Sequence, residues 1–217
     1  MIKYAVFDVD GTLIDSMDMW IHFGENYLRS KGIIVGHELD EYIQYFSMRE
    51  VSEYFSEKYG LGDASDIEKE FKEVTERFYF KEVQLKSGVL TLLKELYDNG
   101  VRMYIATATY SSLVVPALER LGIYKYFEGI VTCSDVGHGK DRPDVFLAAL
   151  DAIEGKVSEA WVFEDAMHGI TTAKAAGFKV CGVYDPTEEE NRQALEEICD
   201  IYTDDLGKLG FEIINEK

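Results

Sequence analysis

Residues 4–13 read YAVFDVDGTL, an apolar run that ends in two aspartates and a glycine. The run over residues 4–7 has the length and character of a buried strand in a parallel sheet. Gly11 gives the chain the freedom to turn directly after that strand. We therefore expect Asp8 and Asp10 to follow the strand and to point into one pocket.

Further short apolar runs have the same form, and each is followed by small or acidic residues and then by a helical pattern. Strands that alternate with helices in this way are typical of a doubly wound parallel sheet. The sequence therefore predicts an α/β fold with a Rossmann-like parallel sheet, and residues 187–190 fit a capping box that opens a last helix. The other expected strands are residues 101–106, 129–131, 160–163 and 179–183, and the glycines expected to end helices are Gly100, Gly122, Gly155 and Gly177.

A long segment separates the first strand from the second, and it far exceeds what a single helical crossover needs. Its apolar residues recur at helical spacing, as at Ile67, Phe71 and Val74, and no part of it alternates with period two. We expect a helical domain over residues 16–86, inserted into a core domain that comprises residues 1–15 and 87–217.

The composition excludes several classes of protein. The chain has 217 residues, with 22 Lys and Arg against 41 Asp and Glu and a formal net charge of −19, so it lacks the basic surface that binds nucleic acids or anionic membranes. No run approaches the roughly 18 apolar residues of a membrane span, and the first residues lack a signal-peptide pattern, so a cytoplasmic protein is expected. Three cysteines without a CxxC pair indicate reduced thiols. A monomer is compatible with the sequence.

Candidate site residues follow the predicted strands at the edge where parallel α/β sheets bind ligands. Carboxylates gathered there repel one another unless a cation neutralises them, and hard oxygen ligands suit Mg²⁺. A hydroxyl and an ammonium group beside such an ion would hold a phosphoryl group. The residues are Asp8 and Asp10 after the first strand, Thr107 and Ala108 after the second, Lys140 after the third, and Glu164 and Asp165 after the fourth.

Together these segments resemble the haloacid dehalogenase (HAD) superfamily of phosphatases and phosphomutases, over nearly the whole chain. The helical insert stands where that family carries a C1-type cap. The matching segments are residues 8–12 (DVDGT) for the DxDGT signature, 105–109 (IATAT) for the second motif, 139–146 (GKDRPDVF) for the lysine motif, and 163–165 (FED) with 169–170 (GI) and 175–177 (AAG) for the acidic fourth motif.

The resemblance implies a Mg²⁺-dependent enzyme that acts on a small phosphorylated metabolite. Asp8 is implied as the nucleophile that forms an aspartyl-phosphate, and Asp10 as the general acid and then the general base. Mg²⁺ would be held by Asp8, the backbone carbonyl of Asp10, and Asp165. Glu164 either contacts the metal, orients a water or only belongs to the loop. The implied phosphoryl-binding residues are Thr107, Ala108 and Lys140.

Two positions depart from the family's usual pattern, and a third residue, Arg49, lies in a stretch that matches it only loosely. Asp141 stands where relatives often have proline, and Ala166 where they often have serine. Arg49 lies in a stretch of the insert from which an arginine of cap-bearing relatives reaches the substrate. A surface salt bridge to a helix acid is the commoner use of such a residue.

Two alternatives remain open from the sequence. A phosphomutase of the β-phosphoglucomutase type shares all four motifs but needs a second phosphate pocket, and residues 16–86 contain 9 Lys and Arg against 15 Asp and Glu, which favours a phosphatase. A receiver-like signalling module also gathers aspartates, a threonine and a lysine around Mg²⁺. Its lysine follows its threonine on the last strand and it has no large insert, whereas here Lys140 precedes Asp165.

Overall fold

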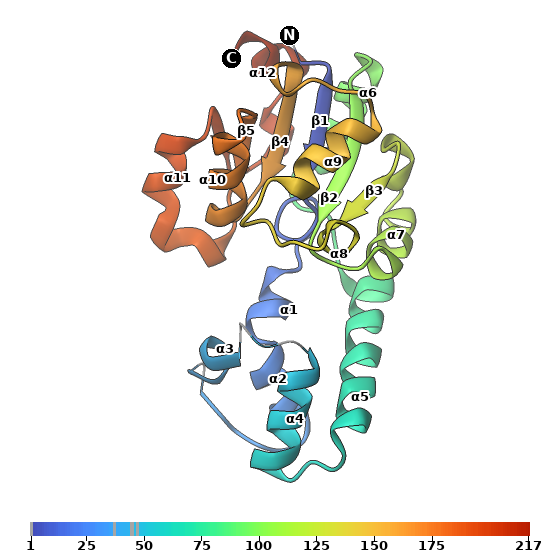
Figure 1. Cartoon of the computed structure of the whole chain (residues 1–217), viewed down its shortest axis with the longest axis vertical. Helices are drawn as coiled ribbons and strands as arrows, with labels where there is room; N and C mark the ends of the chain where they lie inside the picture. The colour runs from blue at the N-terminus through green and yellow to red at the C-terminus, as the bar shows by residue number, and fades with distance from the viewer. Residues whose placement is uncertain (1, 37, 44–45, 47) are drawn as a thin grey trace. The chain divides into compact units, whose positions relative to one another are not determined.

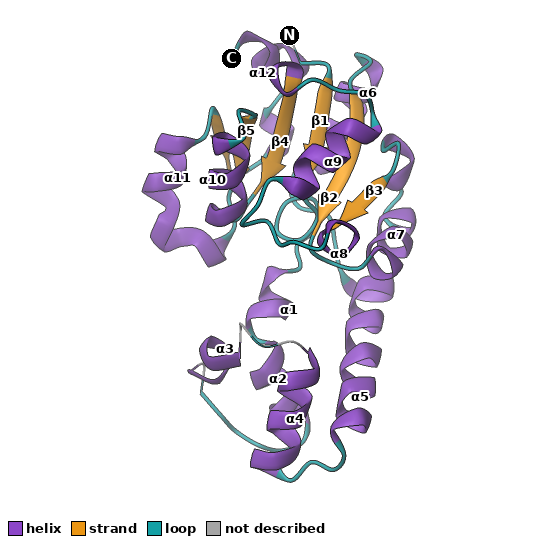
Figure 2. Ribbon diagram, in the orientation of Figure 1, coloured by secondary structure: helices purple, strands orange, loops and turns teal. Residues whose placement is uncertain are grey.

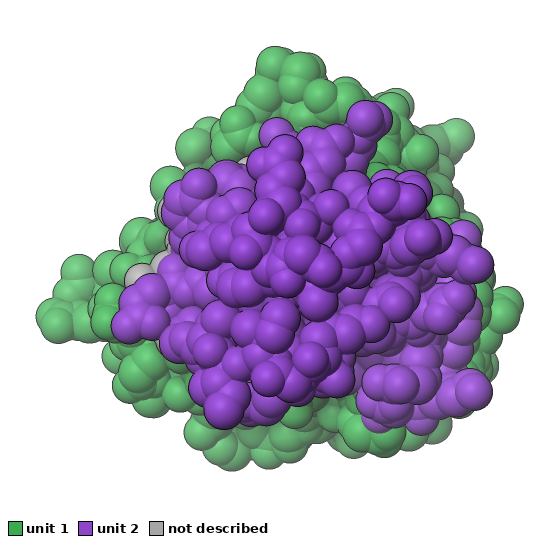
Figure 3. Space-filling model, turned by 90° about the horizontal axis from the view of Figure 1, so that it is seen from below, with its two compact units in different colours: residues 1–16, 83–217 green, residues 17–82 purple. Residues whose placement is uncertain are grey.

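The computed structural model describes residues 2–36, 38–43, 46 and 48–217 of the chain. These residues form two compact units, one of Met1–Ser16 with Val83–Lys217 and one of Met17–Glu82 (Figure 3). Each unit buries a hydrophobic core of its own.

A six-stranded parallel sheet is the centre of the larger unit, with the strand order β3-β2-β1-β4-β5-β6 (Figure 2). The first strand of the chain lies inside the sheet, because Phe7 pairs with Ile105 of β2 on one side and with Phe163 of β4 on the other. The predicted parallel α/β sheet is therefore confirmed. The strands are β1 Tyr4–Phe7, β2 Arg102–Thr107, β3 Ile130–Thr132, β4 Ala160–Glu164, β5 Lys179–Val183 and β6 Ile201–Thr203.

Helices pack against this sheet through apolar side chains. Phe146 of α9 and Ile170 of α10 are fully buried against Val6 and Val162 of the central strands, so α9 and α10 cover one face (Figure 1). The helices of this unit are α6 Val89–Asp98, α7 Ser111–Arg120, α8 Cys133–Val136, α9 Asp144–Ala152, α10 Met167–Ala175, α11 Arg192–Ile198 and α12 Phe211–Glu216, with short 3₁₀ turns at Tyr124–Tyr126, Val157–Glu159, Pro186–Asn191 and Leu206–Lys208.

Two local expectations are wrong. The capping residue after β5 is Asp185, whose side chain accepts the backbone N–H of Thr187 at 3.1 Å and opens a 3₁₀ turn, and α11 and α12 both follow it. The left-handed residue after α9 is Glu154, with φ at 51°, and not Gly155. A Cβ on Gly155 would lie 2.1 Å from the Leu150 side chain, so close packing explains the glycine there.

The described residues of the smaller unit form helices joined by loops. Aromatic rings form its core: Tyr27 and Phe71 meet edge to face at 4.6 Å between centroids, and both also contact Phe55. No helix among the described residues is long and apolar enough to cross a membrane. The elements are α1 Met17–Ile21, α2 Phe23–Ser30, α3 Glu38–Ile43, α4 Met48–Tyr59, α5 Ala64–Arg77 and a π-helical turn at Phe78–Glu82.

Candidate active site

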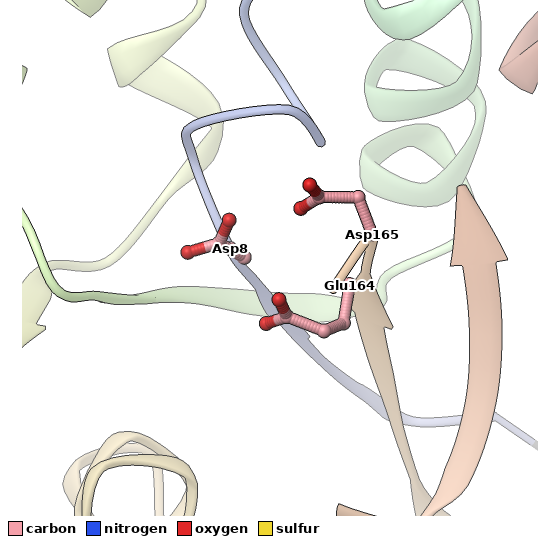
Figure 4. A group of neighbouring side chains, drawn as sticks. All are labelled: Asp8, Glu164 and Asp165. Atoms are coloured by element: carbon pink, nitrogen blue, oxygen red, sulfur yellow. The ribbon is translucent and has the colours of Figure 1, made fainter. Parts of the chain in front are cut away.

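Three buried carboxylates meet at the carboxyl ends of β1 and β4. Asp8 follows β1 directly, Glu164 is the last residue of β4 and Asp165 follows it. One oxygen from each lies within 4.8 Å of the others (Figure 4). The backbone N–H of Asp8 donates to the carbonyl of Phe163 at 2.9 Å, which extends the pairing of the two strands up to the cluster.

The loop after β1 turns tightly and places a hydroxyl on the cluster. The backbone N–H groups of Leu13 and Ile14 both donate to the carbonyl of Val9, and Gly11 has a positive φ of 82° that a glycine adopts without strain. This turn brings Thr12 under the end of β4, where its Oγ1 donates to Oδ1 of Asp165 at 2.9 Å. The loop therefore fixes the orientation of the Asp165 carboxylate.

Lys140 lies between two of the three acids. Its Nζ contacts the carboxylate of Asp8 and donates to Oε2 of Glu164 at 2.8 Å, and the side chain is buried. The departure at Asp141 does not prevent this contact, because Asp141 is exposed while Lys140 reaches inward. At the second departure the backbone N–H of Ala166 donates to Oε1 of Glu164 at 3.3 Å.

The electrostatics of the cluster show that its negative charge is not balanced. Burial raises the pKa of Asp8 to about 8; Lys140 opposes this shift, and Glu164 adds to it. Burial also raises the pKa of Asp165, with the charges of Glu164 and Asp8 as further causes. For Lys140 burial disfavours the charged form, but the two carboxylates outweigh it and raise the pKa. Three acids thus face one ammonium group, and a divalent cation with oxygen ligands fits this donor set.

Asp10 stands beside the turn that follows β2. Its Oδ1 accepts the hydroxyl of Ser16 at 2.6 Å, and its Oδ2 accepts the hydroxyl of Thr109 at 2.7 Å. Thr107 is buried at the end of β2, and its Oγ1 accepts the backbone N–H of Thr109 at 3.1 Å. Ala108, between the two threonines, is exposed.

The structure thus brings the expected residues of the larger unit to one edge of the sheet. Arg49 belongs to the smaller unit, where it is 77% exposed on α4 and its Nε donates to Glu53 at 3.0 Å. Sequence reasoning gave no role to Thr12, Ser16 or Thr109. Thr12 and Thr109 bond to partners 153 and 99 residues away, so no local spacing identifies those contacts.

Comparisons with known proteins show which family this chain is similar to. A family model described as haloacid dehalogenase-like hydrolase matches residues 5–183. The phosphorylated carbohydrates phosphatase of Thermotoga maritima is 26% identical over 179 residues, which cover 82% of this chain and 83% of that protein. The validoxylamine A 7′-phosphate phosphatase of Streptomyces hygroscopicus subsp. limoneus is 28% identical over 209 residues, which cover 95% of both.

A solved structure shows the same fold. The crystal structure of CbbY from Rhodobacter sphaeroides in complex with phosphate has a TM-score of 0.77 and 23% sequence identity, and the match covers 99% of this chain and 100% of that one. The residues that the family model matches include four of the six strands, β2 to β5, most of β1, and every residue of the acidic cluster. This chain therefore belongs to the haloacid dehalogenase-like hydrolases.

Proposed function

We propose that this hydrolase is a phosphatase that passes the phosphoryl group of a small phosphate monoester to Asp8 and then to water. The observation that carries the proposal is the setting of Asp8: its carboxylate is buried, contacts Lys140 and lies two residues before Asp10, whose side chain two hydroxyls hold in place. The names of the two curated relatives support a small phosphorylated substrate.

The reaction has two displacements. In the first, an oxygen of Asp8 attacks phosphorus, the bond from phosphorus to the ester oxygen breaks, and Asp10 as a carboxylic acid gives its proton to the leaving alcohol. In the second, water attacks the phosphorus of the aspartyl-phosphate while the Asp10 carboxylate takes its proton. The bond to Asp8 breaks, which releases phosphate and restores both aspartates.

The remaining residues serve phosphoryl binding and the cation. Lys140 and Thr107, with the Ala108 backbone beside them, would bind the phosphoryl oxygens. Asp8, Asp165 and the backbone carbonyl of Asp10 would hold Mg²⁺, and Glu164 offers a further oxygen within the same cluster. When bound, the ion supplies positive charge against the phosphoryl oxygens.

Hydrolysis is favoured over a phosphomutase reaction, which must recognise a second phosphate. Lys140 is the one buried lysine or arginine in the described part of the chain, and Arg49 is already paired with Glu53. The receiver-like alternative is wrong, because the chain belongs to a hydrolase family. We assign choice of the leaving group to the helical unit, residues 17–82, as its cap.

The test is phosphate release from a panel of phosphorylated sugars, polyols, nucleotides and short acids, with Asp8→Asn beside the wild type. Exposed Asp151 on α9 provides a matched control, Asp151→Asn. We expect turnover of at least one ester by the wild type and the control, and none by Asp8→Asn. Turnover by Asp8→Asn, or no turnover of any ester by the wild type, would overturn the proposal. Formation of a sugar 6-phosphate from the 1-phosphate at a rate above phosphate release would assign a mutase instead.

A further inference from the structure

We propose that Thr109 is a positioning residue, which orients the Asp10 carboxylate for proton transfer to the leaving group. This inference rests on the proposed phosphatase reaction, in which Asp10 is the general acid. It concerns a side chain that would touch neither the phosphoryl group nor the nucleophile.

The geometry of Asp10 shows why two hydroxyls are needed. A carboxylate on a short side chain can rotate about its terminal torsion, since such sp³–sp² torsions have broad minima. Here each oxygen of Asp10 accepts a different hydroxyl, from Thr109 at 2.7 Å and from Ser16 at 2.6 Å. Two donors on the two oxygens fix the plane of the carboxyl group. Removal of the Thr109 hydroxyl takes away the hydrogen bond that it donates to Oδ2 of Asp10.

The placement of Thr109 argues against an ordinary local role for its hydroxyl. A threonine just before a helix commonly bonds to nearby backbone and caps the helix. Here α7 begins at Ser111 and its N-cap residue is Tyr110. No side-chain hydrogen bond from this residue caps the helix. The Thr109 hydroxyl instead reaches Asp10, a residue 99 positions earlier in the chain.

Thr109 also connects the residue that would bind the phosphoryl group with the residue that would act as the acid. Its backbone N–H donates to Oγ1 of Thr107 at 3.1 Å, so the two threonines form one short turn at the end of β2. The branched side chain of a threonine has few accessible rotamers, which keeps the hydroxyl aimed in one direction. The turn that would bind the phosphoryl group therefore also sets the position of the acid.

The consequence is a loss that depends on the leaving group. General acid catalysis contributes about 10²–10⁴-fold when a poor leaving group must be protonated. A misoriented acid retains part of this, so we expect Thr109→Val to lower kcat/KM for an alkyl phosphate by about tenfold. The p-nitrophenolate of p-nitrophenyl phosphate is a good leaving group that departs without a proton, so kcat/KM for this aryl ester should change by less than about twofold. KM for the alkyl ester should stay constant.

The experiment compares Thr109→Val, which removes the hydroxyl at nearly constant shape, with Thr109→Ser, which keeps it. Both are assayed on glycerol phosphate or the best alkyl ester of the panel and on p-nitrophenyl phosphate, with melting temperatures measured alongside. We expect Thr109→Ser to recover at least half of the wild-type kcat/KM on the alkyl ester.

Different results would refute the positioning role of Thr109 and the phosphatase function on which it rests. The positioning role would be overturned by an equal loss of kcat/KM on both esters, by a rise in KM alone, or by a Thr109→Val variant with unchanged kinetics. The phosphatase reaction would still stand in these cases, provided that the wild type turns over and Asp8→Asn is inactive. Failure of Thr109→Ser to recover activity, with its melting temperature unchanged, would also overturn it. Absence of turnover in the wild type would remove the phosphatase itself.

Discussion

Addition of Mg²⁺ to the metal-free protein should displace protons from the acidic cluster. Burial holds the pKa of Asp8 near 8, so at pH 6.5 its carboxyl is almost wholly protonated in the metal-free state. A carboxylate must lose its proton to bind a metal. We therefore expect release of about one proton per Mg²⁺ from Asp8 at pH 6.5, with a further contribution from Asp165. At pH 9 the share of Asp8 falls to about a tenth of a proton.

Calorimetric titration of Mg²⁺ in two buffers of different ionisation enthalpy measures this release. Asp8→Asn should reduce it at pH 6.5 by at least about one proton, since an amide has none to lose. The exposed Asp151→Asn variant should titrate as the wild type does. Binding of Mg²⁺ without proton release would show that the buried carboxyls are already ionised, and absence of binding would show that the cluster is no cation site. Either result refutes the reasoning.

The same groups set the pH dependence of stability. The folded pKa of Asp8 and of Asp165 lies above the usual value near 3.9, so the folded chain binds more protons than the unfolded chain between about pH 4 and pH 8. The free energy of unfolding of the metal-free protein therefore falls as pH rises through that window. Lys140 adds no slope there, because its ammonium is protonated in both states below about pH 10. Mg²⁺ should consequently raise the melting temperature more at pH 8 than at pH 5.5.

Three other substitutions give separate tests, and a fourth serves as a control for the last of them. Above the pKa of Asp8, Lys140→Ala leaves two carboxylates without a cation, so metal-free denaturant unfolding at pH 9 should show a loss of about 3 kcal/mol that Mg²⁺ partly restores. Arg49→Ala removes an exposed ion pair, so stability and kcat/KM should both stay near the wild type, and a tenfold rise in KM would instead place Arg49 at the substrate. Gly88→Ala should cost more than about 2 kcal/mol, since its Cβ would lie 1.7 Å from the backbone N of Gly207. Gly122→Ala has a similar φ of 75° with nothing within 4 Å, so a cost of about 1 kcal/mol is its matched control.

The central strands are the ones that the sequence marks most clearly. Ala160–Glu164 is buried at every position, and its unbroken apolar character marks it without any knowledge of its neighbours. The missed strand, Ile201–Thr203, has three residues, lies at one edge of the sheet and is partly buried. The predicted strand β3 at the other edge has the same length and the same burial, so length and burial alone do not explain the miss. An edge strand of that length owes its conformation to pairing with β5, which no local pattern records.

The capping residue after β5 was predicted at the wrong position because two nearby side chains can each serve as the cap. The sequence offers Thr187 with Glu190 three residues on, which has the form of a capping box. Asp185 stands two residues earlier and is followed by Pro186, which suits the first position of a helical turn. Its carboxylate accepts both the backbone N–H and the hydroxyl of Thr187, so the hydroxyl that the pattern assigned to a cap is a donor instead. Which of two nearby oxygens becomes the cap depends on the course of the chain after β5.

Some features of the site could be predicted from the sequence, and others depend on the fold. Asp8 and Asp165 could be predicted as neighbours because each follows a strand, and parallel strands end at one edge. The hydroxyl contacts could not, since they depend on how far a loop turns after its strand has ended.

Burial determines how strongly each charge of the protein acts on a ligand at the site. Exposed charges are screened over about 8 Å at physiological ionic strength, so most of the formal charge of −19 acts weakly on a ligand at the site. The carboxylates of Asp8, Glu164 and Asp165 are buried and escape that screening. The charge that a phosphate dianion would meet is therefore set by these three groups and Lys140, and it changes with each proton or cation that they bind. An acidic protein can serve an anionic substrate on this condition alone, because the sign of the local charge is decided inside the cluster.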